Sequence, residues 1–316
     1  MFRHTFHTRL LTSLLALIFV GLALTAAQGQ ARQLPAAQSQ RAPSFITVWF
    51  HQVQRPVAIY VPNSYRGDVE IPLVFALHGD GGDASKMFES NKHIVDYAES
   101  QGFIAVFPNG LLLPTDTDPD SHNFYWGDPV NIDYMNHLIN LMTARFTINL
   151  HRIYFIGFSG GGKLCYRLAA DPHISARIAA IATVAGDIGT KQTDPPTSPW
   201  EIIDPSVSVG LAMSALLLQG GADESTPAAG GFKDDYSSIK MSFQSKVDIW
   251  RFFVGAIEGV SEMLPGAPAD VEAMRYTNPA TGNVVISALD PALPHKWPEW
   301  NFMGAIWDFF EHAPTR

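Results

Sequence analysis

A serine flanked by glycines is the residue of this sequence best placed to act as a nucleophile. Ser159 lies in the segment Gly157-Phe158-Ser159-Gly160-Gly161, after an apolar stretch expected to form a buried strand and before an expected helix. Small flanking residues permit the sharp strand-to-helix turn that lifts a serine hydroxyl above a sheet. The same turn puts the Gly160 N–H at a helix N-terminus, where it can stabilise a developing oxyanion. The segment is typical of a nucleophile elbow.

Two other interpretations of these glycines stay open. Residues 157–163 also spell the G-x-x-x-x-G-K part of a phosphate-binding loop, but Leu164 stands where that loop needs a hydroxyl to bind Mg²⁺. The sequence also has an acid, Asp187, at the end of a later strand, as a nucleotide-binding site of this kind would need. Alternatively, the glycines serve only to form a tight turn. The nucleophile interpretation fits the flanking elements best.

A nucleophilic serine of this kind needs an acid and then a histidine later in the chain, each just after a strand. Asp223 follows the apolar strand and glycine turn of residues 216–221, and His295 follows the last expected strand. We therefore predict a triad of Ser159, Asp223 and His295. Asp187 is the alternative acid. The non-catalytic alternatives are that Asp223 only forms a turn and that His295 only lies in a surface loop.

An early glycine-rich segment offers a second oxyanion donor. His78-Gly79-Asp80-Gly81-Gly82 follows the apolar stretch 71–77, at the place where such folds put this donor. We assign the role to the backbone N–H of Asp80, with that of Gly81 as the adjacent possibility. The predicted oxyanion hole thus consists of the Asp80 and Gly160 N–H groups, unless the glycines form only a tight turn.

The elements that must position these residues alternate between strands and helices. Strands are expected over 45–51, 57–61, 71–77, 103–107, 152–157, 178–185, 215–219, 275–277 and 284–289. The first two are expected to form a hairpin around Gln54, Arg55 and Pro56. Helices are expected from the cap Asp83 to Gln101, over 128–146 and 160–170, and at the C-terminus. This alternation predicts an α/β fold with a mostly parallel central sheet and helices on both faces.

The first residues have the parts of a secretory signal peptide. Arg3 and Arg9 precede an apolar run from Leu10 to Ala27 that ends in small residues. A membrane anchor is the alternative, since ~18 apolar residues nearly span a bilayer. We predict a signal peptide over 1–27, an unstructured lead-in over 28–43 and a single α/β domain over 44–316. The mature protein is then expected to be periplasmic or extracellular.

Composition excludes several other classes. Hydrophobic residues make up 47% of the chain and charged residues 16%, so most of it can bury a core and is not disordered. The net charge of −9 disfavours nucleic acid as a partner. The single cysteine, Cys165, can form no internal disulfide and is expected to be a small buried hydrophobe.

No His/Cys cluster has zinc spacing. Residues 116–120 carry acids at every second position, as a calcium loop begins, but Ser121 and Gly127 stand where that loop needs glycine and glutamate. A solvated loop over the site is the favoured interpretation. The aromatic run Phe124-Tyr125-Trp126 beside it either lines a substrate pocket or packs ordinarily.

Taken together, the chain resembles the secreted polyhydroxybutyrate depolymerase and feruloyl esterase family of α/β-hydrolases, which is similar to carbohydrate esterase family 1. The matching segments are LHGDGGD (77–83), NGLLL (109–113), HRIYFIGFSGGGKL (151–164), QGGADESTPAAGG (219–231), PHKWP (294–298) and AIWDFF (305–310). Three features depart from the family pattern. Gln219 stands where the family usually has histidine, and Pro294 where glycine usually precedes the late histidine. The cysteines of many secreted members are missing.

The resemblance implies an α/β-hydrolase fold and a secreted serine esterase that acts through an acyl-enzyme, without cofactor or metal. Ser159 matches the nucleophile, Asp223 the acid and His295 the base. The expected substrates are hydroxybutyrate-type oligomers or feruloyl and acetyl esters of plant cell walls, and no membrane partner is expected after signal cleavage. A peptidase or acyltransferase on the same triad, and a non-catalytic polymer-binding relative, remain alternatives.

Overall fold

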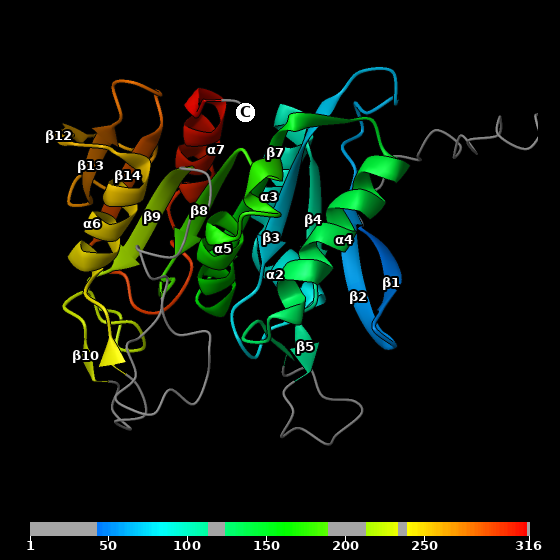
Figure 1. Ribbon diagram of the computed structural model, residues 1–316, viewed down its shortest axis with the longest axis horizontal. Helices are drawn as coiled ribbons and strands as arrows, with labels where there is room; N and C mark the ends of the chain where they lie inside the picture. The colour runs from blue at the N-terminus through cyan, green and yellow to red at the C-terminus, as the bar shows by residue number, and fades with distance from the viewer. Residues whose placement is uncertain (1–42, 113–123, 189–212, 233–238, 315–316) are drawn as a thin grey trace, which may run out of the picture. The chain divides into compact units, whose positions relative to one another are not determined.

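The computed structural model describes residues 43–112, 124–188, 213–232 and 239–314 (Figure 1). The predicted signal peptide, nearly all of the lead-in and the calcium-like segment 116–120 lie outside these residues. Within the described part of the chain, no helix combines the length and apolar character needed to cross a membrane.

A ten-stranded sheet runs through the described residues in the order β1-β2-β4-β3-β7-β8-β9-β14-β13-β12. Neighbouring strands from β4 to β14 in this order pair in parallel, and the outer strands on both sides pair antiparallel. The strands are β1 (Ser44–Phe50), β2 (Val53–Tyr60), β3 (Ile71–Leu77), β4 (Ile104–Pro108), β7 (Ile148–Phe158), β8 (Ala180–Val184), β9 (Ser214–Gly220), β12 (Glu258–Glu262), β13 (Glu272–Thr277) and β14 (Val284–Asp290). The mostly parallel sheet that the sequence predicts is confirmed.

Helices cover both faces of this sheet, because each central strand is apolar on both sides. In β3, Leu73, Phe75 and Leu77 belong to one core, whereas Val74 and Ala76 belong to the other. The first core packs against α4 (Val130–Arg145), α5 (Gly160–Ala170) and α6 (Phe243–Val254), which cross one face in Figure 1. The second packs against α2 (Ala84–Ser90), α3 (Lys92–Gln101) and α7 (Phe302–His312).

The first hairpin turns at a different place from the one predicted. His51 and Gln52 form the turn, both with positive φ (47° and 64°), and Gln54, Arg55 and Pro56 lie inside β2. The prediction was wrong because neither turn residue is a glycine or asparagine, the usual residues for such angles. The Pro56 carbonyl accepts from the Asn109 N–H (3.0 Å). Because the backbone N and C=O of one strand residue point to the same side, those of Pro56 point towards β4. The N–H that proline lacks therefore costs no hydrogen bond between β2 and β1.

The predicted helix from Asp83 to Gln101 is two helices. Asp83 caps α2 as expected, accepting from the Lys86 N–H (2.8 Å), but α2 ends at Ser90. Asn91 leaves helical geometry (φ −117°, ψ 53°) and closes the first helix with its N–H on Met87 O. Gly102, with φ 73°, ends α3 as predicted.

Several described elements were not predicted at all. They are the helix α6, the edge strand β12, the short helix η1 (Ser175–Arg177), and the two-residue pairs β5 (Leu111–Leu112) with β6 (Phe124–Tyr125) and β10 (Gly231–Phe232) with β11 (Ile239–Lys240). The edge strand β12, with the sequence EGVSE, is exposed and lacks the alternation of a half-buried strand.

Candidate active site

The turn between β7 and α5 has the geometry of a nucleophile elbow. Ser159 adopts φ 49° and ψ −115°, a strained conformation for a residue with a side chain. A Cβ on Gly157 would collide with the backbone of Gly161, and one on Gly160 would collide with the Asp80 carboxylate. Glycine is therefore required at position 157, whereas a side chain at position 160 would displace the Asp80 carboxylate. Leu164, which disfavours a phosphate-binding loop, is buried in the core.

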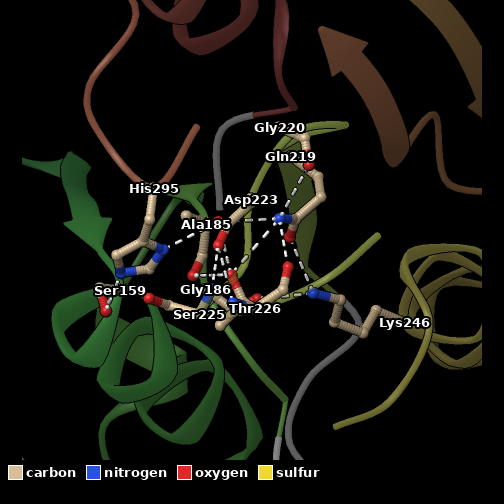
Figure 2. Close-up of polar contacts among 10 residues, drawn as sticks. All are labelled: Ser159, Ala185, Gly186, Gln219, Gly220, Asp223, Ser225, Thr226, Lys246 and His295. Atoms are coloured by element: carbon tan, nitrogen blue, oxygen red, sulfur yellow. Dashed lines mark hydrogen bonds and ion pairs between the residues drawn. The ribbon is translucent and has the colours of Figure 1, made fainter. Parts of the chain in front are cut away.

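Three side chains that follow three different parallel strands form one line of hydrogen bonds (Figure 2). His295 Nε2 lies 2.9 Å from Ser159 Oγ, and His295 Nδ1 lies 2.8 Å from Asp223 Oδ2. A carboxylate only accepts, so Nδ1 donates to Asp223 and Nε2 is left to accept from the serine hydroxyl. The carboxyl ends of parallel strands share one edge of the sheet, which is why these distant residues meet.

The Asp223 carboxylate is held from several sides. Oδ1 accepts from the N–H groups of Ser225 (2.9 Å) and Thr226 (2.7 Å), and Oδ2 accepts from the Thr226 hydroxyl (2.7 Å). Burial by itself raises the pKa of Asp223, but the hydrogen bonds from His295 and Thr226 outweigh burial and leave that pKa below its ordinary value. Asp223 is thus held in its ionised form beside the histidine.

The alternative acid lies in a different environment. Asp187 is buried and its charged neighbour is Lys240, 3.3 Å away. His295 Nδ1 is already engaged by Asp223. This arrangement favours Asp223 over Asp187 as the partner of the histidine.

The loop after β3 lies against the elbow. The Gly81 N–H, the adjacent candidate for the oxyanion hole, donates to Phe124 O (2.8 Å), which favours the Asp80 N–H for that role. The Asp80 carboxylate accepts from the Trp126 N–H (3.2 Å). Burial raises the pKa of Asp80, although the Trp126 N–H and the charges of Lys163, Lys240 and Arg167 act in the opposite direction.

His78 fixes the shape of this loop. Its Nε2 accepts from the Gly110 N–H (3.1 Å), so Nδ1 carries the proton and donates to Gly79 O (2.7 Å). The His78 carbonyl accepts from Trp126 Nε1 (2.7 Å). Burial lowers the pKa of His78 to about 4, so the imidazole is neutral at physiological pH.

The aromatic run beside this loop divides between two environments. Trp126 is 1% exposed and packs in the core, whereas Phe124 and Tyr125 are half-buried. Ordinary packing therefore accounts for Trp126. Cys165 is buried in α5, and burial raises the pKa of its thiol, which fits the predicted small hydrophobe. In the described segments, no group of three or more His, Cys, Asp or Glu side chains is arranged to hold a metal ion.

The sequence assigned no role at the site to three residues around the acid, and Gln219 was noted only as a departure from the family pattern. Gln219 donates to Asp223 Oδ2 (3.2 Å), Thr226 donates to the same oxygen, and Lys246 donates to Gln219 (2.9 Å). Gln219 and Thr226 lie within a recognised motif, but Lys246 lies in the unpredicted helix α6. The signal available for it was a lysine three residues after Phe243 and four before Trp250, on the same face of a helix as both.

Sheet order, elbow and loop positions together define the α/β-hydrolase fold. The solved acetyl xylan esterase from Aspergillus awamori has the same fold, with a TM-score of 0.60 and 15% identity over 85% of this chain and 100% of that one. The predicted fold class is confirmed.

The chain is similar in sequence to several esterases over part of its length. Feruloyl esterase B of Thermothelomyces thermophilus is 32% identical over 115 residues, which cover 35% of this chain and 38% of that protein. The bifunctional acetylxylan esterase/xylanase of Neocallimastix patriciarum is 29% identical over 132 residues, covering 42% and 18% respectively. The chain spans about half or less of the length of the curated relatives that it matches. No protein-family model matches it.

Over part of its length the chain is thus similar to feruloyl and acetylxylan esterases, which confirms that part of the predicted resemblance. The link to polyhydroxybutyrate depolymerases remains a prediction.

Proposed function

We propose that the protein is a serine hydrolase of carboxylic esters. The hydrogen-bonded line from Ser159 through His295 to Asp223 carries this proposal. The relationship to feruloyl and acetyl xylan esterases supports the choice of an ester over an amide bond.

In the proposed reaction, His295 Nε2 removes the hydroxyl proton as Ser159 Oγ attacks the ester carbonyl carbon. The carbonyl oxygen becomes an oxyanion that accepts from the Gly160 and Asp80 N–H groups. The tetrahedral intermediate collapses, His295 returns the proton to the departing alcohol, and an acyl-serine remains. Water, deprotonated by His295, then attacks the acyl carbon and releases the acid with regeneration of the serine hydroxyl. The ionised Asp223 stabilises the imidazolium that forms in both halves.

The proposed substrates are feruloyl and acetyl esters of plant cell-wall polysaccharides, with hydroxybutyrate-type oligomers as a second group. The first group is proposed because the curated relatives are named as feruloyl and acetylxylan esterases. The second is proposed because the sequence motifs resemble those of polyhydroxybutyrate depolymerases. We also propose that the protein is exported by its N-terminal segment and acts in the periplasm or outside the cell.

Labelling with a fluorophosphonate tests the nucleophile directly. The wild type should form a covalent adduct on Ser159, located by peptide mass spectrometry, and Ser159→Ala should form none. The same variant should lose about 10⁴- to 10⁶-fold in kcat on an ester substrate while its thermal unfolding is unchanged. Activity within about tenfold of wild type would remove Ser159 from the mechanism.

A substrate panel then separates the ester classes. Feruloyl esters, acetylated xylo-oligosaccharides, hydroxybutyrate oligomers and a matched peptide amide should be compared by kcat/KM. Preference for either of the first two supports a cell-wall esterase. Preference for hydroxybutyrate oligomers supports the depolymerase alternative, and a preferred amide would mark a peptidase.

A further inference from the structure

A buried lysine lies directly behind the acid of the proposed triad. Lys246, on α6, is 1% exposed, and its Nζ donates to Gln219 Oε1 (2.9 Å) and to Gly186 O (3.0 Å). Figure 2 shows Ser159 and His295 at one end of the polar network, Lys246 at the other, and Asp223 and Gln219 between them. A buried ammonium is costly unless it is paired, so this placement calls for a compensating network.

Gln219 is the link between the lysine and the acid. Its Nε2 has two hydrogens and two good acceptors, Thr226 O (2.7 Å) and Asp223 Oδ2 (3.2 Å). Its Oε1 faces the Lys246 ammonium. If the amide were turned over, Oε1 would face the carboxylate and the carbonyl, and the NH₂ would face the ammonium. The neighbours therefore permit one orientation of the amide.

The oxygen that Gln219 contacts is the one that accepts from His295. Asp223 Oδ2 lies 2.8 Å from His295 Nδ1, whereas Oδ1 is held by the loop's own N–H groups. Lys246 also ties α6 to the carbonyl of Gly186, just beyond β8. The lysine thus connects three elements at the point where the histidine's partner must be held still.

Lys246 carries its charge under the conditions of an assay near neutral pH. Burial lowers its pKa to about 8, and Lys240 acts in the same direction, whereas the carboxylates of Asp187 and Asp223 oppose the shift. The Phe243 ring, 5.8 Å away on the same helix, gives a further favourable contact for the cation.

We propose that Lys246 is a positioning residue for the reaction: it holds the Gln219 amide in the orientation that restrains Asp223 Oδ2 against His295. Without the ammonium, Gln219 Oε1 becomes a buried acceptor without its partner, and the amide turns or shifts to satisfy it. This inference rests on the proposed function, since it needs Asp223 and His295 to act in turnover.

A double-mutant cycle on kcat tests the link. Lys246→Met keeps the length of the side chain and removes its charge and donors. It should lower kcat roughly tenfold, the effect of one charge-assisted hydrogen bond, and change KM by less than about twofold. Gln219→Leu should cause a similar loss. Lys246→Met added to Gln219→Leu should lower kcat by no more than about twofold, because the link is already broken.

Val247→Ala is the matched control, because Val247 is the neighbouring buried residue on α6 and its truncation destabilises the core without touching the network. It should lower the unfolding temperature and leave kcat unchanged. If Lys246→Met keeps the wild-type kcat, or if the two losses multiply to about a hundredfold, Lys246 does not act through Gln219.

Should Lys246→Met fail to fold, Gln219→Leu and the apolar pair Gln219→Leu/Lys246→Met decide. Wild-type kcat in Gln219→Leu, or a further loss of more than about twofold in the pair, would overturn the link. Retained turnover in Ser159→Ala would instead overturn the proposed function, so the two failures are distinguishable.

Discussion

The two buried acids near the histidine differ in what surrounds them. Asp223 is held by N–H and O–H donors and contacts His295. Among the residues that the structure describes, neither Asp187 oxygen has a hydrogen bond, and Oδ2 lies 3.3 Å from the Lys240 ammonium. Only the environment of Asp223 orients an imidazole.

Asp223→Asn should therefore cost about 10⁴-fold in kcat, because an amide permits the wrong tautomer of His295. Asp187→Asn should cost far less. Rates of ester hydrolysis for both variants, with circular dichroism to verify folding, decide between them, and the reverse ranking would transfer the role to Asp187.

Ser159, Asp223 and His295 could be singled out from the sequence because each follows an apolar strand, and parallel strands end at one edge. Lys246 could not, because its partner Gln219 is 27 residues away and the contact depends on where α6 packs. The Asp80 carboxylate beside Gly160 is a similar case, since only the loop's folded path brings the two together.

At the scale of elements, the sequence predicts the bounds of a helix or strand correctly where the segment has a strong local pattern. β3 and α5 have the predicted bounds, because an unbroken apolar run and a glycine-opened helix are strong local signals. The hairpin turn at His51-Gln52 and the break at Asn91 were missed, because both depend on angles that these residues adopt only under tertiary constraint.

The cap of α2 gives a stability prediction at this scale. Asp83 is buried and accepts from the Lys86 N–H, so Asp83→Ala should lower the free energy of unfolding by about 1 kcal/mol. Asp83→Ser, which can still cap, should restore most of it. Lys86→Ala removes the exposed partner of the Asp83 ion pair (3.4 Å) and should have little effect. Urea unfolding of the three variants measures this, and a larger loss in Lys86→Ala than in Asp83→Ala would contradict the capping argument.

At the scale of the whole chain, the N-terminal segment makes a prediction about processing. Expressed with residues 1–27 in a bacterial host, the exported protein should begin near Gln28, after the small residues that end the apolar run. Intact mass spectrometry of the periplasmic and culture fractions reports this. A full-length product in the membrane fraction would favour the anchor instead.

His78 makes the stability of the whole molecule sensitive to acid. Burial lowers its pKa from 6.5 to about 4, so the folded protein holds the neutral ring while the unfolded chain takes up a proton first. This contribution is fully present above pH 6.5 and is lost as pH falls towards 4, a change of roughly 3 kcal/mol. The free-energy advantage of wild type over His78→Gln should therefore shrink across that window in urea unfolding. An advantage that is constant with pH would show that His78 titrates alike in both states.

The rate of turnover should depend on pH for a separate reason, and the two effects can be told apart. The histidine base must be neutral to accept the serine proton, so kcat/KM should rise with pH on the acidic side of neutrality and then level off. The acid keeps its charge across this range, because the hydrogen bonds that outweigh burial hold the pKa of Asp223 below its ordinary value. A loss of rate at low pH that reverses at once on returning to neutral pH reports the base, whereas one that recovers slowly or incompletely reports the unfolding that His78 promotes. A flat profile from about pH 5 to 9 on an ester whose chemical step limits the rate would exclude His295 as the base.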